Sequence, residues 1–138
     1  MLHTSALTLF LNGAPLLTLP PLRVAPGEVL TLMGPSGCGK SSLLAALAGV
    51  LPPGGPIRLT GDILLGTHRL TPLPPQERGV GILFQDDLLF AHLTAAENLM
   101  FGMPAHLKGM AARQTRAREA LAEVGLEAQA DKLPGALS

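Results

Sequence analysis

The chain has 138 residues, of which 47% are hydrophobic and 14% charged, and its ten basic and ten acidic side chains cancel. This composition excludes a disordered chain, and the charge balance favours neither nucleic acid nor an anionic membrane as a partner. The sequence contains no uninterrupted apolar run of about 18 residues, so no membrane-spanning helix is expected. Residues 1–18 lack the basic start of a signal peptide. The single cysteine, Cys38, excludes an intrachain disulfide and suits a reducing compartment.

The N-terminal part of the chain predicts a β-hairpin. Residues 5–11 are typical of a strand, and Asn12-Gly13 is the strongest short hairpin signal in the sequence. Residues 16–24 are expected to form the returning strand, and Pro20-Pro21 confines part of it to a sheet edge or a bulge.

A strand, a glycine-rich loop and a helix are predicted next. Residues 29–33 are apolar and partly β-branched, which favours a buried strand. Residues 42–48 favour a helix that Gly49 ends. Between them, the phosphate-binding pattern G-x-x-x-x-G-K-[ST] is met by Gly34-Pro35-Ser36-Gly37-Cys38-Gly39-Lys40-Ser41.

This loop has the chemistry that a nucleoside triphosphate requires. Glycine lets the backbone turn and approach the phosphates, successive amides form an anion-binding nest, and the helix adds its positive end. Lys40 is expected to reach the β- and γ-phosphates, and the Ser41 hydroxyl to ligate Mg²⁺. A chance glycine-rich turn is the alternative, and the offsets of Lys40 and Ser41 weigh against it. Cys38 is interpreted as a small filler rather than a redox group.

Two more β-segments follow the predicted helix. Residues 57–65 favour a strand with Gly61 as a bulge. Residues 66–76 form a connection that exposes His68 and Arg69. Residues 79–84 are apolar, predict another buried strand and end at Gln85.

The C-terminal part favours helices. Thr94 and Glu97 match a capping box for a short helix that ends at residue 101, and a longer helix is expected over residues 105–124. Its apolar face consists of Leu107, Met110, Ala117, Leu121 and Val124. The basic residues of this helix are Lys108, Arg113, Arg116 and Arg118. They could form an anion-binding patch or a solvated helix face, and we favour the solvated face.

These stretches together resemble the ATP-binding subunits of ABC transporters of the bacterial importer type. The resemblance covers nearly the whole chain, and the combination of phosphate loop, glutamine loop and signature onset is specific. The matching stretches, besides the phosphate loop, are Gly27-Glu28, Gly61-Asp62-Ile63, residues 78–86, residues 89–94, Glu97-Asn98 and residues 133–138.

The resemblance implies an α/β fold, the P-loop NTPase core of the ABC type, with an antiparallel β-subdomain, an incomplete parallel sheet and the start of a helical subdomain. Residues 1–93 would form the ATP-binding core and residues 94–138 part of the helical subdomain. ATP would be bound by Gly34 to Ser41, Ser42 and the glutamine-loop residue Gln85. Mg²⁺ would be ligated by Ser41 and Gln85.

The same resemblance implies partners and a location. Residues from Asp86 to Leu93 would receive a transmembrane permease subunit. Leu137 and Ser138 would begin the signature that binds the γ-phosphate of ATP held by a second ATP-binding subunit in a homodimer. No nucleic acid is expected to bind. The subunit would lie at the cytoplasmic face of the inner membrane and couple ATP hydrolysis to import.

The chain departs from the family pattern in two respects. The position of the usual adenine-stacking aromatic residue is occupied by Leu11, and the adjacent Phe10 would face the other side of the strand. The chain also stops at Ser138, before the rest of the signature, the later acidic residue that polarises water and the switch histidine. His3, His68, His92 and His106 precede the signature and cannot replace that histidine.

No catalytic residue is therefore assigned in these 138 residues. Asp86 and Asp87 are the nearest substitutes for the missing acid, and we interpret them as surface acids at the permease interface. Three hypotheses remain: the N-terminal part of an ABC importer ATPase, a nucleotide-binding fragment without turnover, and a P-loop kinase or GTPase. The absence of an N-K-x-D motif weighs against a GTPase. The sequence does not indicate the transported substrate.

Overall fold

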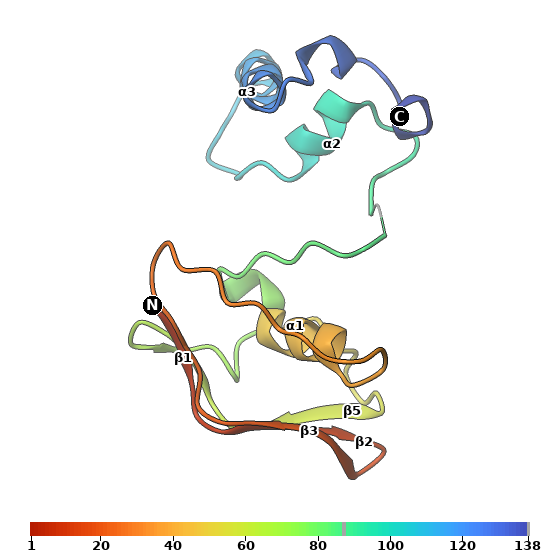
Figure 1. Ribbon diagram of the computed structural model, residues 1–138. Helices are drawn as coiled ribbons and strands as arrows, with labels where there is room; N and C mark the ends of the chain where they lie inside the picture. Colours follow the sequence, from red (N-terminus) through yellow and green to blue (C-terminus); the bar gives the residue numbers. More distant parts are fainter. Residues whose placement is uncertain (87, 138) are drawn as a thin grey trace. The chain divides into compact units, whose positions relative to one another are not determined.

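The computed structural model describes residues 1–86 and 88–137. The chain divides into two compact units, Met1–Leu83 and a second that begins at Phe84, and each is described by itself (Figure 1). The functional boundary expected after Leu93 stays a prediction. Among the described residues, no helix combines the length and the apolar content needed to cross a membrane.

The strands of the first unit form two small antiparallel sheets (Figure 1). One sheet contains, in spatial order, β4 (Arg23–Val24), β1 (Leu2–Thr4), β6 (Ile63–Leu65) and β7 (His68–Arg69). The other contains β3 (Ala14–Leu19), β2 (Leu7–Leu11) and β5 (Ile57–Thr60). The predicted antiparallel β-subdomain is thus present.

The predicted hairpin joins β2 to β3. Asn12 and Gly13 have φ values of 51° and 85°. A two-residue hairpin turn of type I′ requires positive φ at both of its central residues. Leu9 pairs with Leu17, whereas the next residue, Phe10, pairs with Pro15. The residue skipped on β3 is Leu16, so this strand contains a β-bulge beside the loop that follows β4 in the chain.

The strands expected over residues 16–24 and 57–65 are each broken where the chain passes from one sheet to the other: β3 ends at Leu19 before β4, and β5 ends before Gly61. The chain also changes sheets between β1 and β2, at Ser5, whose hydroxyl accepts a hydrogen bond from the amide of Asp62 at 2.8 Å. The break after β5 falls at Gly61, with φ 104°, where a Cβ would lie 2.8 Å from Leu7 Cδ2. Gly61 is therefore a corner between sheets and not the predicted bulge.

Helix α1 (Lys40–Ala48) covers the inner face of these sheets (Figure 1). It begins two residues before the predicted start and ends, as predicted, at Gly49, whose φ is 80°. The buried residues that form the core of the first unit are Leu7, Leu9, Leu43, Ala46, Ile63 and Leu70. Burial of these side chains fixes α1 against β2 and β6.

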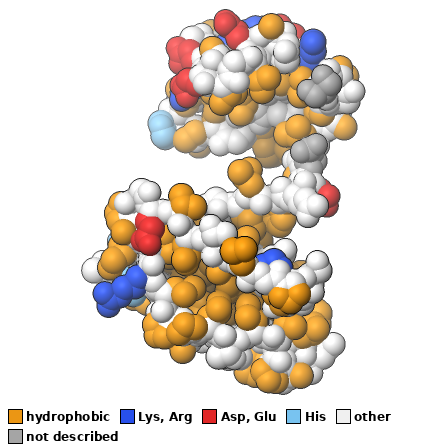
Figure 2. Space-filling model, in the orientation of Figure 1, with side chains coloured by type: hydrophobic (Ala, Val, Ile, Leu, Met, Phe, Trp, Pro, Cys, Tyr) orange, Lys and Arg blue, Asp and Glu red, His pale blue; other side chains and the backbone are white. Residues whose placement is uncertain are grey.

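The two predicted parallel strands are not formed, so this part of the fold prediction was wrong. No described residue forms a strand ladder with residues 29–33 or 79–84. An apolar run forms a strand only where a neighbouring strand offers hydrogen-bond partners. Val29, Met33 and Leu83 are instead 88%, 90% and 98% exposed, and hydrophobic side chains cover much of the face of the first unit seen in Figure 2.

The second unit is built on α2 (Ala95–Phe101) and α3 (Met110–Glu123). The predicted capping box is confirmed: Glu97 N donates to Thr94 Oγ1 at 3.2 Å, and Thr94 N donates to Glu97 Oε2 at 2.7 Å. The hydrogen bonds from Thr94 lower the pKa of the Glu97 carboxyl. The described residues also form three short 3₁₀ turns, η1 (Pro75–Glu77) in the first unit and η2 (Glu127–Gln129) and η3 (Pro134–Ala136) in the second.

Helix α3 is shorter than the predicted helix over residues 105–124. Its N-cap is Gly109, with φ 92°, a conformation that interrupts a helix. Ala117 and Leu121 are buried as expected, but Met110 and Val124 are 65% and 68% exposed, so the predicted apolar face is only partly buried.

Two of the basic side chains of α3 form ion pairs on the surface of the second unit. Arg116 contacts Glu123 at 3.0 Å, and Arg118 contacts Asp131 at 2.7 Å. These partners place Arg116 and Arg118 on a solvated helix face, the interpretation that the sequence favoured.

Candidate nucleotide-binding site

The glycine-rich loop adopts a backbone that only glycine readily allows. Gly37 and Gly39 have φ values of 79° and 97°. Gly39 is the N-cap of α1, and Lys40 and Ser41 are the first two helical residues. The loop thus leads directly into the N-terminus of α1, where the helix dipole favours an anion.

The amides of this loop are available to a ligand. Cys38 N donates a long hydrogen bond to Pro35 O, at 3.4 Å. Among the hydrogen bonds of the described residues, none is donated by the amides of Ser36, Gly37 or Gly39. The first amides of α1 have no partner in a preceding helical turn either. Unpaired amides on a loop of this shape form an anion-binding nest.

The Lys40 ammonium lies within the same loop. Its Nζ donates to Gly34 O at 2.8 Å and to Pro35 O at 2.7 Å, and it lies 3.7 Å from Cys38 Sγ. The charge is therefore held among the loop residues by weakly basic carbonyl groups. A phosphate oxygen would be a stronger partner, because hydrogen bonds between two ionised groups are the strongest in proteins.

Two leucines of β3 support the loop from the hairpin side. A Cβ built on Gly39 would lie 3.2 Å from Leu16 Cδ2 and 3.6 Å from Leu17 Cβ. The bulge at Leu16 thus brings β3 against the N-cap of α1. The sequence did not predict this contact, because the bulge depends on the pairing of β2 with β3.

The residues expected to ligate Mg²⁺, Ser41 and Gln85, stay predicted ligands. Ser41 is exposed on the first turn of α1, beside the half-buried Ser42. The described residues contain no cluster of three or more His, Cys, Asp or Glu side chains that could hold a metal ion. A single hydroxyl still suits Mg²⁺, which usually combines one or two protein ligands with phosphate oxygens and water.

Gln85 and the glycine-rich loop belong to different units. Gln85 and Asp86 are exposed residues of a bend in the second unit, whereas the loop belongs to the first unit. The role of Gln85 therefore stays a prediction. Asp87 and Ser138 lie outside the described residues, and Leu137 is half-buried after η3.

The side chain of Asn98 forms hydrogen bonds with the segment expected to receive a permease, the residues from Asp86 to Leu93. Its Oδ1 accepts a hydrogen bond from Phe90 N at 2.9 Å, and its Nδ2 donates to Leu93 O and Thr94 O, both at 3.0 Å. The sequence drew attention to Asn98 only through the family resemblance. Its side chain fixes the turn that precedes α2, and the ring of Phe90 lies 4.5 Å from that of Phe101.

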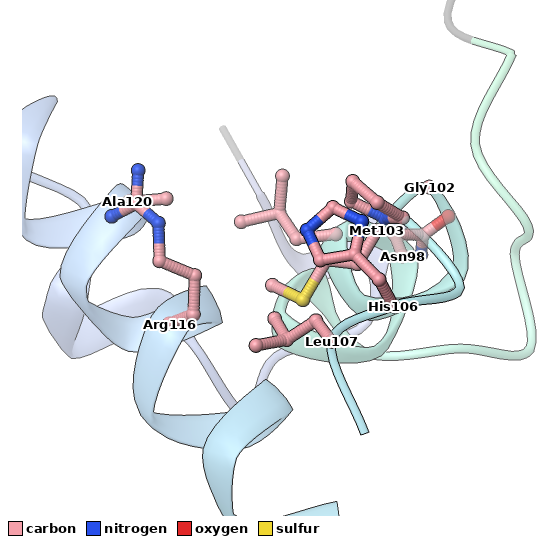
Figure 3. Close-up of a pocket in the computed structure, with 9 residues that line it drawn as sticks. Asn98, Gly102, Met103, His106, Leu107, Arg116 and Ala120 are labelled. Atoms are coloured by element: carbon pink, nitrogen blue, oxygen red, sulfur yellow. The ribbon is translucent and has the colours of Figure 1, made fainter. Parts of the chain in front are cut away.

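A hollow of about 590 Å³ lies between α2, the segment that follows it and the part of α3 that contains Arg116 and Ala120 (Figure 3). Figure 3 shows Arg116 on one side and Met103, His106 and Leu107 on the other. None of the loop residues 34–42 lines it. Its lining is mostly apolar, and its one guanidinium is already paired with Glu123, so the hollow offers no comparable site for phosphates.

Comparison with known proteins assigns the family. A family model for ABC transporters matches residues 20–138. The chain belongs to the ABC transporter family, among its ATP-binding proteins.

Several ATP-binding proteins of ABC transporters are similar to this chain. The chain is 41% identical over 138 residues to an uncharacterized ABC transporter ATP-binding protein, YnjD, of Escherichia coli, and covers 62% of it. It is 42% identical over 117 residues to the thiamine import ATP-binding protein ThiQ of Vibrio vulnificus, a match that covers 85% of this chain and 48% of ThiQ. The putative 2-aminoethylphosphonate import ATP-binding protein PhnT of Salmonella typhi is 41% identical over 117 residues, with 85% and 30% covered.

A solved structure supports the same fold. The ATP-binding cassette MJ0796, as a dimer in a post-hydrolysis state bound to ADP and Pi, matches this chain with a TM-score of 0.78 and 26% identity. The match covers all of this chain and 63% of that one. The chain therefore has the ABC ATPase fold over the part that it shares with MJ0796, and it spans roughly a third to three-fifths of the lengths of these relatives.

Proposed function

We propose that this chain is the nucleotide-binding part of an ABC importer ATPase and that its loop, Gly34 to Ser41, holds the phosphates of ATP. One observation carries the proposal: unpaired loop amides and the Lys40 ammonium meet at the N-terminus of α1. This combination of a nest, a cation and a helix terminus is suited to a polyphosphate. A nucleotide site built in this way gains most of its affinity from the phosphates.

Each residue of the site has a proposed role. The amides between Ser36 and Ser42 donate to phosphate oxygens, and Lys40 exchanges the carbonyls of Gly34 and Pro35 for the β- and γ-phosphates. Cys38 fills the space beside Gly34, where a Cβ would lie 3.0 Å from its sulfur. Ser41 and Gln85 hold Mg²⁺, which neutralises charge on the phosphates when it is bound.

The partners follow from the proposed role in import. The names of ThiQ and PhnT describe import proteins, and they support a bacterial importer without indicating what this one carries. A permease subunit would dock on the residues from Asp86 to Leu93, a turn that Asn98 holds in shape. A second copy would bind through Leu137 and Ser138, and the complex would lie at the cytoplasmic face of the inner membrane.

Equilibrium binding of a fluorescent ATP analogue to the 138-residue chain tests the proposed site. Unlabelled ATP, ADP and inorganic triphosphate are the competitors, and AMP is the control. We expect the first three to displace the probe and AMP to fail, because AMP lacks the β- and γ-phosphates. Displacement by AMP as strong as that by ATP would mean that the base, and not the loop, dominates binding.

The aliphatic residue at the adenine position predicts weak discrimination between bases. Leu11 is 38% exposed at the end of β2, and Phe10 is half-buried opposite Pro15. Leu11→Tyr is expected to tighten ATP binding by roughly 0.5–1.5 kcal/mol, the contribution of an aromatic pair, measured by the same competition. If Leu11→Tyr has no effect and Phe10→Ala weakens binding, Phe10 is the stacking residue and the predicted register is wrong by one.

A further inference from the structure

Arg78 is a buried cation that forms hydrogen bonds only with backbone carbonyls. Its side chain is 8% exposed. Nη1 donates to Ala46 O at 2.8 Å and Leu47 O at 3.0 Å, Nη2 donates to Thr71 O at 3.1 Å, and Nε donates to Leu73 O at 2.8 Å. Burial lowers the pKa of the guanidinium, and no carboxylate among the described residues forms an ion pair with it.

Two of these carbonyls belong to the last turn of α1. The final carbonyls of a helix lack partners within the helix and carry the negative end of its dipole. Arg78 satisfies Ala46 O and Leu47 O and places a positive charge there. The other end of α1 is the N-terminus that carries the phosphate loop. Arg78 thus contacts α1 at the end opposite to the phosphate loop.

The other two carbonyls lie in the segment just before Arg78. Bonds to Thr71 O and Leu73 O fix the guanidinium to residues 71–78, a stretch that directly follows the buried Leu70. Arg78 therefore ties the end of α1 to a separate part of the first unit. Without it, the direction of the helix would depend on the packing of its apolar side chains, such as Leu43 and Ala46.

Gly49 leaves the space that this arrangement requires. A Cβ at Gly49 would lie 2.7 Å from Arg78 Cζ and 2.9 Å from Cδ, well inside van der Waals contact. Its φ of 80° also disfavours any residue with a Cβ. Gly49 was predicted as the end of the helix, but its contact with Arg78 could not be predicted, because the two residues are far apart in the sequence.

We propose that Arg78 is a positioning residue for nucleotide binding, which acts through α1 to aim the loop amides and Lys40 at the phosphates. This inference rests on the proposed function of the loop. A helix of nine residues is about 13 Å long, so a tilt of about 5° at its C-terminus moves the loop by about 1 Å. Displacements of that size can cost up to about a hundredfold in the function of a site.

Two variants test the proposal in the complete protein that contains this chain. Arg78→Lys keeps the charge but cannot reach four carbonyls at once, because an ammonium has three donors and no planar fork. Gly49→Ala keeps the arginine and displaces it. We expect each to weaken binding of the fluorescent ATP analogue by roughly tenfold, and the double variant to be little worse than either, because both changes release the same contact.

The chain offers a matched control for each variant. Arg113 also donates to backbone carbonyls, among them Leu107 O at 3.1 Å, but it lies in the second unit. Gly125, with φ 74°, follows the end of α3, and a Cβ there would meet nothing within 4 Å. We expect Arg113→Lys to lower the melting temperature about as much as Arg78→Lys does, and Gly125→Ala to lower it less than Gly49→Ala does, because at Gly125 only the backbone is strained. Both control variants are expected to change nucleotide affinity by less than about twofold.

The result separates this inference from the proposed function. If the wild-type protein does not bind the analogue, the proposed function is wrong and the inference fails with it. If the wild-type protein binds through Lys40 while folded Arg78→Lys and Gly49→Ala bind equally well, Arg78 only stabilises the fold and the inference alone is wrong. If Arg78→Lys does not fold, Gly49→Ala compared with Gly125→Ala decides.

Discussion

Replacing Lys40 with alanine is expected to abolish ATP·Mg²⁺ binding in the complete protein. The ammonium is placed among the loop residues by its bonds to Gly34 O and Pro35 O, and it is the one cation of the motif. A hydrogen bond to a charged group contributes about 1.5–3 kcal/mol, and two such bonds to the β- and γ-phosphates correspond to a loss of at least a hundredfold in affinity. Titration with the fluorescent ATP analogue measures it.

Lys108→Ala is the matched control, because Lys108 is an exposed lysine of the second unit, outside the loop. It is expected to bind the analogue like the wild-type protein. The melting temperature of Lys40→Ala is measured as well, because the variant also loses two hydrogen bonds within the loop. Wild-type affinity in a folded Lys40→Ala protein would contradict the assignment of the phosphate site.

The 138-residue chain alone is expected to bind nucleotide weakly and not to hydrolyse ATP above background. Hydrolysis needs a group that orients the attacking water, and the residues that the structure describes include no acidic residue at the end of a strand next to the loop. Residues 29–33 and 79–84 also lack strand partners among the described residues, so the loop is supported mainly by α1 and β3. A poorly supported loop positions the phosphates less accurately, and small errors in position cost much of the rate.

Phosphate release by purified residues 1–138 measures this turnover, with Lys40→Ala as the blank. Equal, background-level release from both proteins is the expected result. Release that depends on Lys40 would show that a residue already present completes the site, with Asp86 and Asp87 as the first candidates to replace by asparagine.

Features decided by a few neighbouring residues could be predicted from the sequence. The hairpin turn at Asn12-Gly13, the capping box of Thr94 and Glu97 and the end of α1 at Gly49 all have the predicted form. Each depends on backbone conformation or on hydrogen bonds between residues at most a few positions apart. The residue types of the phosphate loop were predictable for the same reason.

Features that depend on distant parts of the chain could not be predicted. Residues 29–33 and 79–84 have the composition of buried strands, but composition does not supply a hydrogen-bonded neighbour. The corner at Gly61 depends on contact with Leu7 of another strand. Arg78 meets α1 across more than thirty positions of sequence, and an arginine beside an apolar run is more often exposed.

Amide exchange measured by nuclear magnetic resonance, with and without ATP and Mg²⁺, tests the central claim most directly. If the loop holds the phosphates, the amides of Ser36, Gly37, Gly39 and Lys40, which form the nest, become protected when ATP is added, while those of Asn12 and Gly13 in the hairpin turn do not change. Saturating ATP that leaves the loop amides exchanging at their free rate, or that protects a different segment instead, would contradict the account.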